Sequence, residues 1–405
     1  MADTVTLLDA LTKEKYIKGN ELKNMMFKGD PFLQVIKVTN DFTGDLCKHP
    51  VIVGGTNKRS ATYASAEANT GGVQSTAFHL TRVKDYVLME LDREASLALP
   101  NDMAAFKKSF EVEMDTGLQK LRNSISQSIM SAGNGVVGQI STDSTVASDT
   151  ITLADTNDIV AFEVGDVIQL YTALTGGTVR SSGDTAEVTA VDYDLGTLSF
   201  AGNLTDEIAA AVAGDYIAMR GDYGNKITGV GAWLPSSAPS ATSFFGVDRS
   251  TNPTRLGGIR VDGTGLSVVE AINRATVRVN RLGGSPDYLF VNHSVYEDIM
   301  NTLDASRHVY TDDKNGVIGF NYLYAKGIAS DVKIVAHRYV PSNTGFLVQA
   351  DTWNLRTLGG FPDVHRDDGT IWRLRDASDT LQARASVYGN VGCSAPGWNA
   401  RITFA

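Results

Sequence analysis

The sequence predicts an α+β protein with one long central helix and an inserted all-β domain. Three observations predict this fold class: an apolar stripe at helical spacing over 103–131, short β-rich runs on both sides of it, and an acidic segment, 144–220, of different composition. The 405 residues allow two or three domains. Hydrophobic residues at 42% and charged residues at 20% are typical of a chain that folds, and differ from the composition of disordered proteins.

The charge and cysteine content exclude some classes of protein. Lys and Arg number 36 against 46 Asp and Glu, so the net charge is −10, which argues against a protein whose main task is to bind nucleic acid. Cys47 and Cys393 lie far apart, which fits neither a disulfide framework nor a metal cluster and favours synthesis in a reducing compartment. The first residues lack the basic region and the following apolar run of a signal peptide, so we expect no signal peptide. Because no run of about 18 apolar residues occurs, we expect no membrane span either.

The segment from Cys47 to Val83 predicts a hairpin arm. The runs Pro50–Val53 and Gln74–Val83 have β character, and the stretch between them consists mainly of glycine and small polar residues with few large aliphatic ones. Such a stretch cannot build a core of its own. Since isolated hairpins are marginal in water, we expect this arm to rest on another chain.

The segment 103–131 predicts one long helix. Apolar residues recur there at steps of three or four, Asn101-Asp102 offers a cap, and Gly133-Asn-Gly135 ends the run. At 1.5 Å per residue the helix would be roughly 40 Å long, more than twice the length of an average helix. We interpret it as a structural beam.

The acidic segment predicts a small barrel or sandwich inserted into the chain. Between Ser144 and Met219 the sequence has twelve acidic residues against a single basic one, Arg180, so the rest of the chain is close to neutral. Short β-rich runs alternate with turn residues. These runs are Thr150–Leu153, Val167–Tyr171, Ala186–Asp192, Thr197–Phe200 and Tyr216–Met219.

The remainder predicts an irregular run, then an α/β unit, then strands. Residues 229–265 are rich in Gly, Pro, Ser and Thr without a steady period, which is typical of a binding surface or assembly contact. Ser267-x-x-Glu270 and Ser294-x-x-Glu297 are capping boxes that each predict a helix start. Strands are predicted at Tyr288–Val291, Val332–Ala336, Thr344–Gln349, Trp353–Leu358, Thr370–Leu374 and Leu381–Tyr388.

The motif search yields no catalytic, cofactor or metal site. Gly54–Ser60 lacks the glycine before lysine of a phosphate loop, Gly263–Val268 is explained by the capping box, and Asp312–Gly316 lacks the ligands of a calcium loop. The six histidines form no HxH or HxxxH pair, and no Gly-x-Ser-x-Gly elbow occurs. We therefore expect a protein that is not an enzyme and has no cofactor.

The order of these elements, namely a hairpin arm, a long helix, an α/β domain and a returning β segment, resembles the major capsid protein of tailed bacteriophages, the Hong Kong 97-type fold. Several sequence blocks are similar to blocks of that family, and together with the element order they extend the resemblance over most of the chain. These blocks are Phe245–Ser250, Pro253–Leu256, Gly284–Asp287, Asp351–Trp353 and Ala395–Ile402.

The resemblance implies a division of the chain. An N-terminal arm would span 1–46, an extended loop 47–85, and a peripheral domain 86–143 with 351–392, including the spine helix 103–131. The acidic insertion domain would span 144–220, with an outward-facing position as our hypothesis, and the axial domain 221–350 with 393–405.

The resemblance also implies function. The chain would self-assemble into pentamers and hexamers of an icosahedral head that encloses double-stranded DNA, held only by weak, non-specific contact. It would be formed in the host bacterial cytoplasm and remain in the virion, with a separate scaffold protein, a portal and a decoration protein as partners, and no membrane. Expected inter-subunit contacts are Lys58, Arg59, Thr62 and Tyr63 at the loop tip and Lys107, Lys108 and Glu111 on the spine helix. Two alternatives stay open: an encapsulin-like bacterial compartment, and an enzyme with an accessory β-domain.

Overall fold

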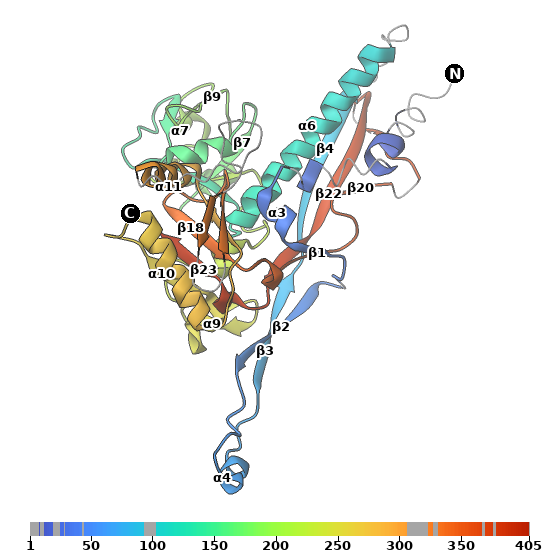
Figure 1. Cartoon of the computed structure of the whole chain (residues 1–405). Coiled ribbons are helices and arrows are strands. Elements are labelled where there is room, and N and C mark those ends of the chain that lie inside the picture. Colours follow the sequence, from blue (N-terminus) through green and yellow to red (C-terminus); the bar gives the residue numbers. More distant parts are fainter. Residues whose placement is uncertain are drawn as a thin grey trace.

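The computed structural model is an elongated α+β molecule whose two ends are a hairpin arm and a long helix (Figure 1). It describes residues 8, 12–18, 25–27, 29–42, 44–92, 103–305, 323–326, 331–366, 369–375 and 378–404. The segment 312–316, for which we rejected a calcium loop, and the expected cap at 101–102 lie outside these residues. The mixed α+β class predicted from the sequence is confirmed.

The long helix α6, Met103–Met130, begins where the apolar stripe predicts and ends one residue before the predicted end. Its inner side chains are fully buried from Phe110 to Ile129. It lies along strands β4, Val83–Asp92, and β22, Thr380–Cys393, which pair antiparallel from Thr380 opposite Asp92 to Gly389 opposite Val83. Helix and sheet approach closely at Gly117, where a Cβ atom would lie 2.5 Å from Cγ of Met89. A larger residue there would push the helix off the sheet.

The sheet beneath α6 has six strands and gathers both ends of the chain. Its order is β1-β19-β22-β20, with β4 and β21 also on β22. The remaining bounds are β1 Lys37–Thr39, β19 Trp353–Thr357, β20 Asp363–Val364 and β21 Arg373–Leu374. Near the N-terminus lie the π-helix η1, Lys13–Lys18, and the helix α3, Pro31–Val35. The predicted strand Thr370–Leu374 is shorter than expected, and β22 is longer.

The arm consists of β2, Leu46–Gly54, and β3, Gln74–Thr81, in antiparallel register from Leu46 opposite Thr81 to Gly54 opposite Gln74. The predicted hairpin is confirmed. Its tip also carries a short helix, α4, Tyr63–Ala68, which the sequence analysis did not predict. Figure 1 shows the tip far from the rest of the molecule.

A second six-stranded sheet has the order β14-β23-β18-β15-β17-β16, with parallel and antiparallel neighbours. The bounds are β14 Ile259–Asp262, β23 Ala400–Thr403, β18 Thr344–Val348, β15 Tyr288–Val291, β17 Asp331–Ala336 and β16 Leu323–Lys326. Helices α10, Val268–Arg281, and α11, His293–Ala305, pack with it around one apolar core. The capping box of Ser267 and Glu270 is confirmed.

The second predicted capping box is wrong. Helix α11 begins at His293, and the backbone N–H and hydroxyl of Ser294 donate to Oδ1 of Asn292 at 3.1 Å. Asn292 is buried, and its own amide donates to the carbonyl of Val340 at 2.8 Å. This tertiary contact holds the Asn292 side chain at the helix start, so Asn292 takes the capping position that we assigned to Ser294.

Residues 136–219 form two small sheets around an apolar core of their own, which includes Ile151, Leu170 and Ile217. The sheets have the orders β6-β10-β9 and β5-β11-β7-β8. The strands are β5 Val136–Gln139, β6 Thr150–Thr152, β7 Val167–Tyr171, β8 Ala186–Glu187, β9 Ala190–Asp192, β10 Thr197–Ser199 and β11 Tyr216–Met219, with helices η2 Thr156–Ala161, η3 Arg180–Gly183 and α7 Leu204–Glu207. Strand β5 precedes the predicted start at 144, and the expected run 186–192 is divided into β8 and β9.

The connection 229–265 contains short regular elements, so the expectation of an irregular run is wrong in detail. These are α8 Val230–Trp233, β12 Ser243–Phe244, β13 Val247–Asp248, η4 Arg249–Thr251 and α9 Pro253–Gly257, followed by β14. The physical reason is a buried aromatic cluster. Trp233 is fully buried, with its ring centroid 4.8 Å from that of Phe78 and 5.1 Å from that of Phe244. The segment therefore packs on the root of the arm. The chain closes with η6, Pro396–Trp398, before β23.

Candidate functional site

The tip of the arm is the most exposed described part of the chain. All residues from 55 to 65 are exposed, and 81% of the Tyr63 side chain is accessible to solvent. The expected contact residues Lys58, Arg59, Thr62 and Tyr63 lie together here. Polar contacts hold the tip: the Thr62 hydroxyl donates to Oγ of Ser65 at 2.8 Å, and Asn69 donates to the carbonyl of Arg59 at 3.3 Å. The tip thus offers side chains to a partner without packing on its own chain.

The root of the arm, in contrast, is firmly anchored. Arg356 on β19 forms an ion pair with Asp41 and donates to Nδ1 of His49 at 3.3 Å and to Sγ of Cys47 at 3.4 Å. Burial, together with the positive charge of Arg356, lowers the pKa of His49 to about 4. His49 is therefore neutral at pH 7 and can accept the hydrogen bond from Arg356.

Gly392 of β22 allows the arm to cross the sheet closely. A Cβ atom on Gly392 would lie 2.9 Å from Leu80 and 3.3 Å from His49, both in the strands of the arm. Leu80 is fully buried in this contact. The direction of the arm is therefore fixed at its root.

The expected spine-helix contacts lie far from the arm tip. Glu111 pairs with Lys15 at 3.2 Å, so it binds the N-terminal segment of its own chain. Lys107 and Lys108 lie in α6, and their side chains are outside the described residues. Figure 1 shows the start of α6 and the arm tip at opposite ends of the molecule, so the two groups of expected contact residues do not form one site.

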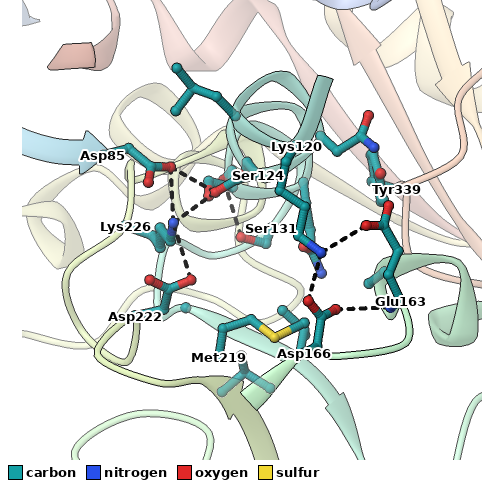
Figure 2. Close-up of a pocket in the computed structure, with 18 of the residues that line it drawn as sticks. Asp85, Lys120, Ser124, Ser131, Glu163, Asp166, Met219, Asp222, Lys226 and Tyr339 are labelled. Atoms are coloured by element: carbon teal, nitrogen blue, oxygen red, sulfur yellow. Dashed lines mark hydrogen bonds and ion pairs between the residues drawn. The ribbon is translucent and has the colours of Figure 1, made fainter. Parts of the chain in front are cut away.

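A polar cleft of about 320 Å³ separates α6 and β4 from the unit 136–219. Figure 2 shows two lysines that cross it. Lys226 forms ion pairs with Asp85 at 2.9 Å and Asp222 at 3.1 Å. It also donates to Oγ of Ser124 at 2.7 Å. Lys226 thereby joins β4, α6 and the segment that follows β11.

The second lysine, Lys120 on α6, reaches the acidic unit directly. It pairs with Asp166 at 2.6 Å and Glu163 at 2.8 Å (Figure 2). Burial alone would lower the pKa of Lys120, but the hydrogen bonds and charges of Asp166 and Glu163 raise it by a larger amount. The pKa of Lys120 is therefore above its ordinary value. Both carboxylates belong to the unit 136–219, and this contact fixes that unit against the long helix.

The Asp85, Ser124 and Lys226 side chains form a triangle that is similar in composition to a serine–lysine nucleophile. Its electrostatics oppose that use. Burial lowers the pKa of Lys226, but the charges of Asp85 and Asp222 raise it by more. Lys226 is therefore protonated at neutral pH and cannot take a proton from Ser124. The triangle acts as an ion-pair clamp.

A second cleft, of about 520 Å³, lies between the unit 136–219 and the sheet that contains β18 and β23. Burial, reinforced by the charge of Asp155, raises the pKa of Asp158 to about 7. Burial also lowers the pKa of Arg401, whose guanidinium lies over the ring of Phe346 at 5.7 Å. A perturbed acid in a cleft is what the enzyme alternative predicts.

The terminal Trp398–Arg401 block contains a structural residue that the search for chemistry missed. Asn399 is fully buried, accepts from the Trp353 indole at 2.9 Å and from the backbone of Gln349 at 2.8 Å, and donates to the carbonyl of Ala395 at 2.9 Å. This side chain joins the two six-stranded sheets at the chain end. In the sequence, Asn399 was marked only by lying in the block Ala395–Ile402, which is similar to a block of the capsid family.

Among the described residues, no group of three or more His, Cys, Asp or Glu side chains could hold a metal ion. No described helix is long and apolar enough to cross a membrane. Both cysteines are buried free thiols.

No protein-family model matches the sequence, and a search of curated proteins found no match. Among solved structures, the chain is similar to one from the cyanophage A-1(L) capsid asymmetric unit, with 12% identity, 92% of each chain covered and a TM-score of 0.47. It is also similar to a chain of the satellite phage P4 procapsid that includes the size determination protein, with 10% identity, 95% and 98% coverage and a TM-score of 0.39. A third structure is the virus-like particle from Pyrococcus furiosus, with 7% identity, 94% and 95% coverage and a TM-score of 0.41.

Phage capsid structures are thus among those to which this chain is similar.

Proposed function

We propose that this chain is the major coat protein of a tailed-phage head, assembling with copies of itself into rings of five and six that close into a shell around double-stranded DNA. The observation that carries the proposal is the arm. Its root is anchored by Arg356 and closely packed against β22, whereas all residues from 55 to 65 at its tip are exposed. A rigidly aimed hairpin without a core of its own is stabilised by packing on another chain.

The proposed division of the chain follows from this role. Residues 1–46 act as the N-terminal arm and 47–85 as the extended loop, and 86–143 with 351–392 form the peripheral domain. Residues 144–220 are the insertion domain, and 221–350 with 393–405 form the axial domain. The separate core of the unit 136–219 supports an insertion, but it includes Val137 and Ile140, so the structure favours a start near 136 rather than 144. The pairing of β23 with β14 and β18 supports joining 393–405 to the axial part.

Closed shells follow from surfaces of this kind. A heterologous contact generates rings when its rotation closes, and one chain can occupy rings of five and six when its adapting segment is flexible. Individual contacts of about 800 Å² per partner suffice, since many contacts per subunit act together in a closed shell. A separate scaffold protein, a portal and a decoration protein are the further partners we propose.

Electron microscopy of the purified protein after size-exclusion chromatography tests the proposal, with and without a candidate scaffold. We expect hexamers and pentamers, or uniform closed shells. A variant in which Asn-Gly replaces residues 56–72 removes the tip while keeping β2 and β3. It should fold normally, with unchanged tryptophan fluorescence, and fail to form shells.

The matched control changes only one side chain of the tip. Tyr63→Phe retains the exposed ring and should assemble, whereas Tyr63→Ser should assemble poorly, because the apolar surface it offers to a neighbour is lost. A wild-type protein that stays monomeric under all conditions would overturn the coat-protein proposal. Such a result would direct attention to the cleft of Asp158 and the enzyme alternative, whereas shells filled with a cargo enzyme would support the compartment alternative.

A further inference from the structure

Charge is distributed unevenly over this molecule, and its two charged surfaces lie apart. The unit 136–219 has 13 acidic residues and one basic residue, a net charge of −12 against −10 for the whole chain, and β9 lies in its outer part in Figure 1. Helix α10 lies at the other end of the body, with α11 and the sheet that contains β18 between them. A molecule with unlike charges at two ends can associate head to tail.

The exposed side of α10 is basic and partly apolar. Arg274, Arg278 and Arg281 follow one another at helical spacing and are exposed. Within the described part of the chain none of the three forms an ion pair, although the charge of Arg274 acts on Glu270. Arg278 donates to the backbone carbonyl of Arg260 at 3.1 Å. Val277 and Leu282 are exposed among them, by 36% and 50%. Arginines around exposed aliphatic side chains are typical of an interface.

The turn between β9 and β10 has the complementary chemistry. Asp192, Tyr193, Asp194 and Leu195 are all exposed, with 56% of Tyr193 and 66% of Leu195 accessible. Other acidic side chains of this unit already have partners: Glu163 and Asp166 bind Lys120, and Asp215 binds Arg180. The turn thus presents two carboxylates beside two apolar side chains, and among the described residues its hydrogen-bond partners include no basic side chain.

The turn is also held in one shape. Oδ1 of Asp192 accepts from the backbone N–H groups of Asp194 and Leu195 at 2.9 and 3.0 Å, and the Tyr193 hydroxyl donates to the carbonyl of Phe162 at 3.0 Å. A preordered turn loses little conformational entropy on binding. Asp194 and Leu195 are therefore exposed at the tip of a preordered turn.

We propose that the 192–195 turn of one copy docks on the arginine face of α10 of the next copy in the ring. The inference rests on the proposed coat-protein function and names one of its contacts. Asp194 pairs with Arg278 and its neighbours, and Leu195 packs beside Val277. Because the two surfaces differ, the contact is heterologous and propagates from copy to copy until the ring closes.

Charge exchange in the full-length protein tests the contact. Asp194→Arg and Arg278→Glu each place like charges opposite one another, and we expect each to raise the concentration needed for ring formation by about tenfold or more. The double variant restores opposite charges and should recover most of the loss. Ring formation is measured by analytical ultracentrifugation at two salt concentrations, since salt weakens a contact of exposed charges.

A matched control makes the same charge change elsewhere in the acidic unit. Asp184→Arg alters an exposed carboxylate outside the turn and should leave ring formation unchanged. Each variant is compared with wild type by thermal unfolding. Where a reversal fails to fold, the milder Asp194→Asn and Arg278→Gln replace it.

The outcomes separate the inference from the function on which it rests. If single reversals leave ring formation unchanged while the wild type forms shells, the contact is wrong and the coat-protein proposal stands. If Arg278→Glu weakens assembly and Asp194→Arg does not rescue it, the arginine face binds another partner, such as nucleic acid, and the contact is again wrong. A wild type that never assembles overturns both.

Discussion

Removing the ammonium group of Lys226 should destabilise the protein strongly. The Lys226 side chain is only 9% exposed and lies 2.9 Å from a carboxylate oxygen of Asp85 and 3.1 Å from one of Asp222. Lys226→Met keeps the side-chain volume but leaves two partly buried carboxylates without their cation. Breaking a buried ion pair in this way costs about 3 to 5 kcal/mol of unfolding free energy. Because Asp222 is partly exposed, we expect a loss of about 3 kcal/mol, at the lower end of this range.

Equilibrium urea unfolding followed by tryptophan fluorescence measures this loss, since the fully buried Trp233 lies close to Lys226 in the chain. The double variant with Asp85→Asn should lose less than the two single variants added together. The control is Arg375→Met: this arginine pairs with Glu90 at 3.2 Å, with side chains 52% and 37% exposed, so we expect a loss below about 1 kcal/mol. If Lys226→Met costs no more than Arg375→Met, the clamp is not a source of stability.

Three further changes test other parts of the structure. The raised pKa of Asp158, about 7, means that the folded state holds this proton more tightly than the unfolded state does; its stabilising effect is complete below about pH 4 and is lost as the pH rises to about 7. Asp158→Asn should remove that loss, so urea midpoints of variant and wild type should diverge between pH 4.5 and pH 8. Asn399→Ala leaves the buried Trp353 indole without its acceptor and should lower the free energy of unfolding in urea by about 3 kcal/mol. Asn399→Asp keeps an acceptor oxygen and should therefore lose less stability than Asn399→Ala. Gly392→Val should force Leu80 away from β22 and redirect the arm, so that shells disappear in electron micrographs while subunits remain folded; normal shells would contradict our view of the arm root.

Local patterns explain why parts of this fold could be predicted from the sequence. Helix α6 was predictable because its apolar residues recur every three or four positions along its 28 residues. The start of α10 was predictable because Ser267 and Glu270 satisfy each other's backbone within four residues. The acidic segment stood out because its charge differs from that of the flanking chain.

The features that the sequence did not predict depend on distant partners or lack a pattern. Asn292 caps α11 because the carbonyl of Val340, 48 residues away in the chain, accepts a hydrogen bond from its amide and holds the side chain in place. Without that distant contact, Ser294 looked equally suitable as the cap. Lys226 meets Asp85 across 141 residues, and no spacing rule marks that pair. Helix α4 consists of small and polar residues without an apolar stripe, and its helical shape depends on local propensity alone.

The arm has a closely packed root and a solvent-exposed tip, so the direction of the arm and the shape of its tip are determined separately. Arg356 and the close approach of Leu80 to Gly392 determine where the arm leaves the body, so each copy aims its tip in the same direction. Polar contacts within the tip itself, such as that between Thr62 and Ser65, are exposed and therefore weak. In the proposed shell, a tip held this loosely can adjust to rings of five and of six at little cost in free energy, while the root keeps the register between copies. Stiffening the tip should therefore narrow the range of ring sizes before it reduces the stability of the subunit.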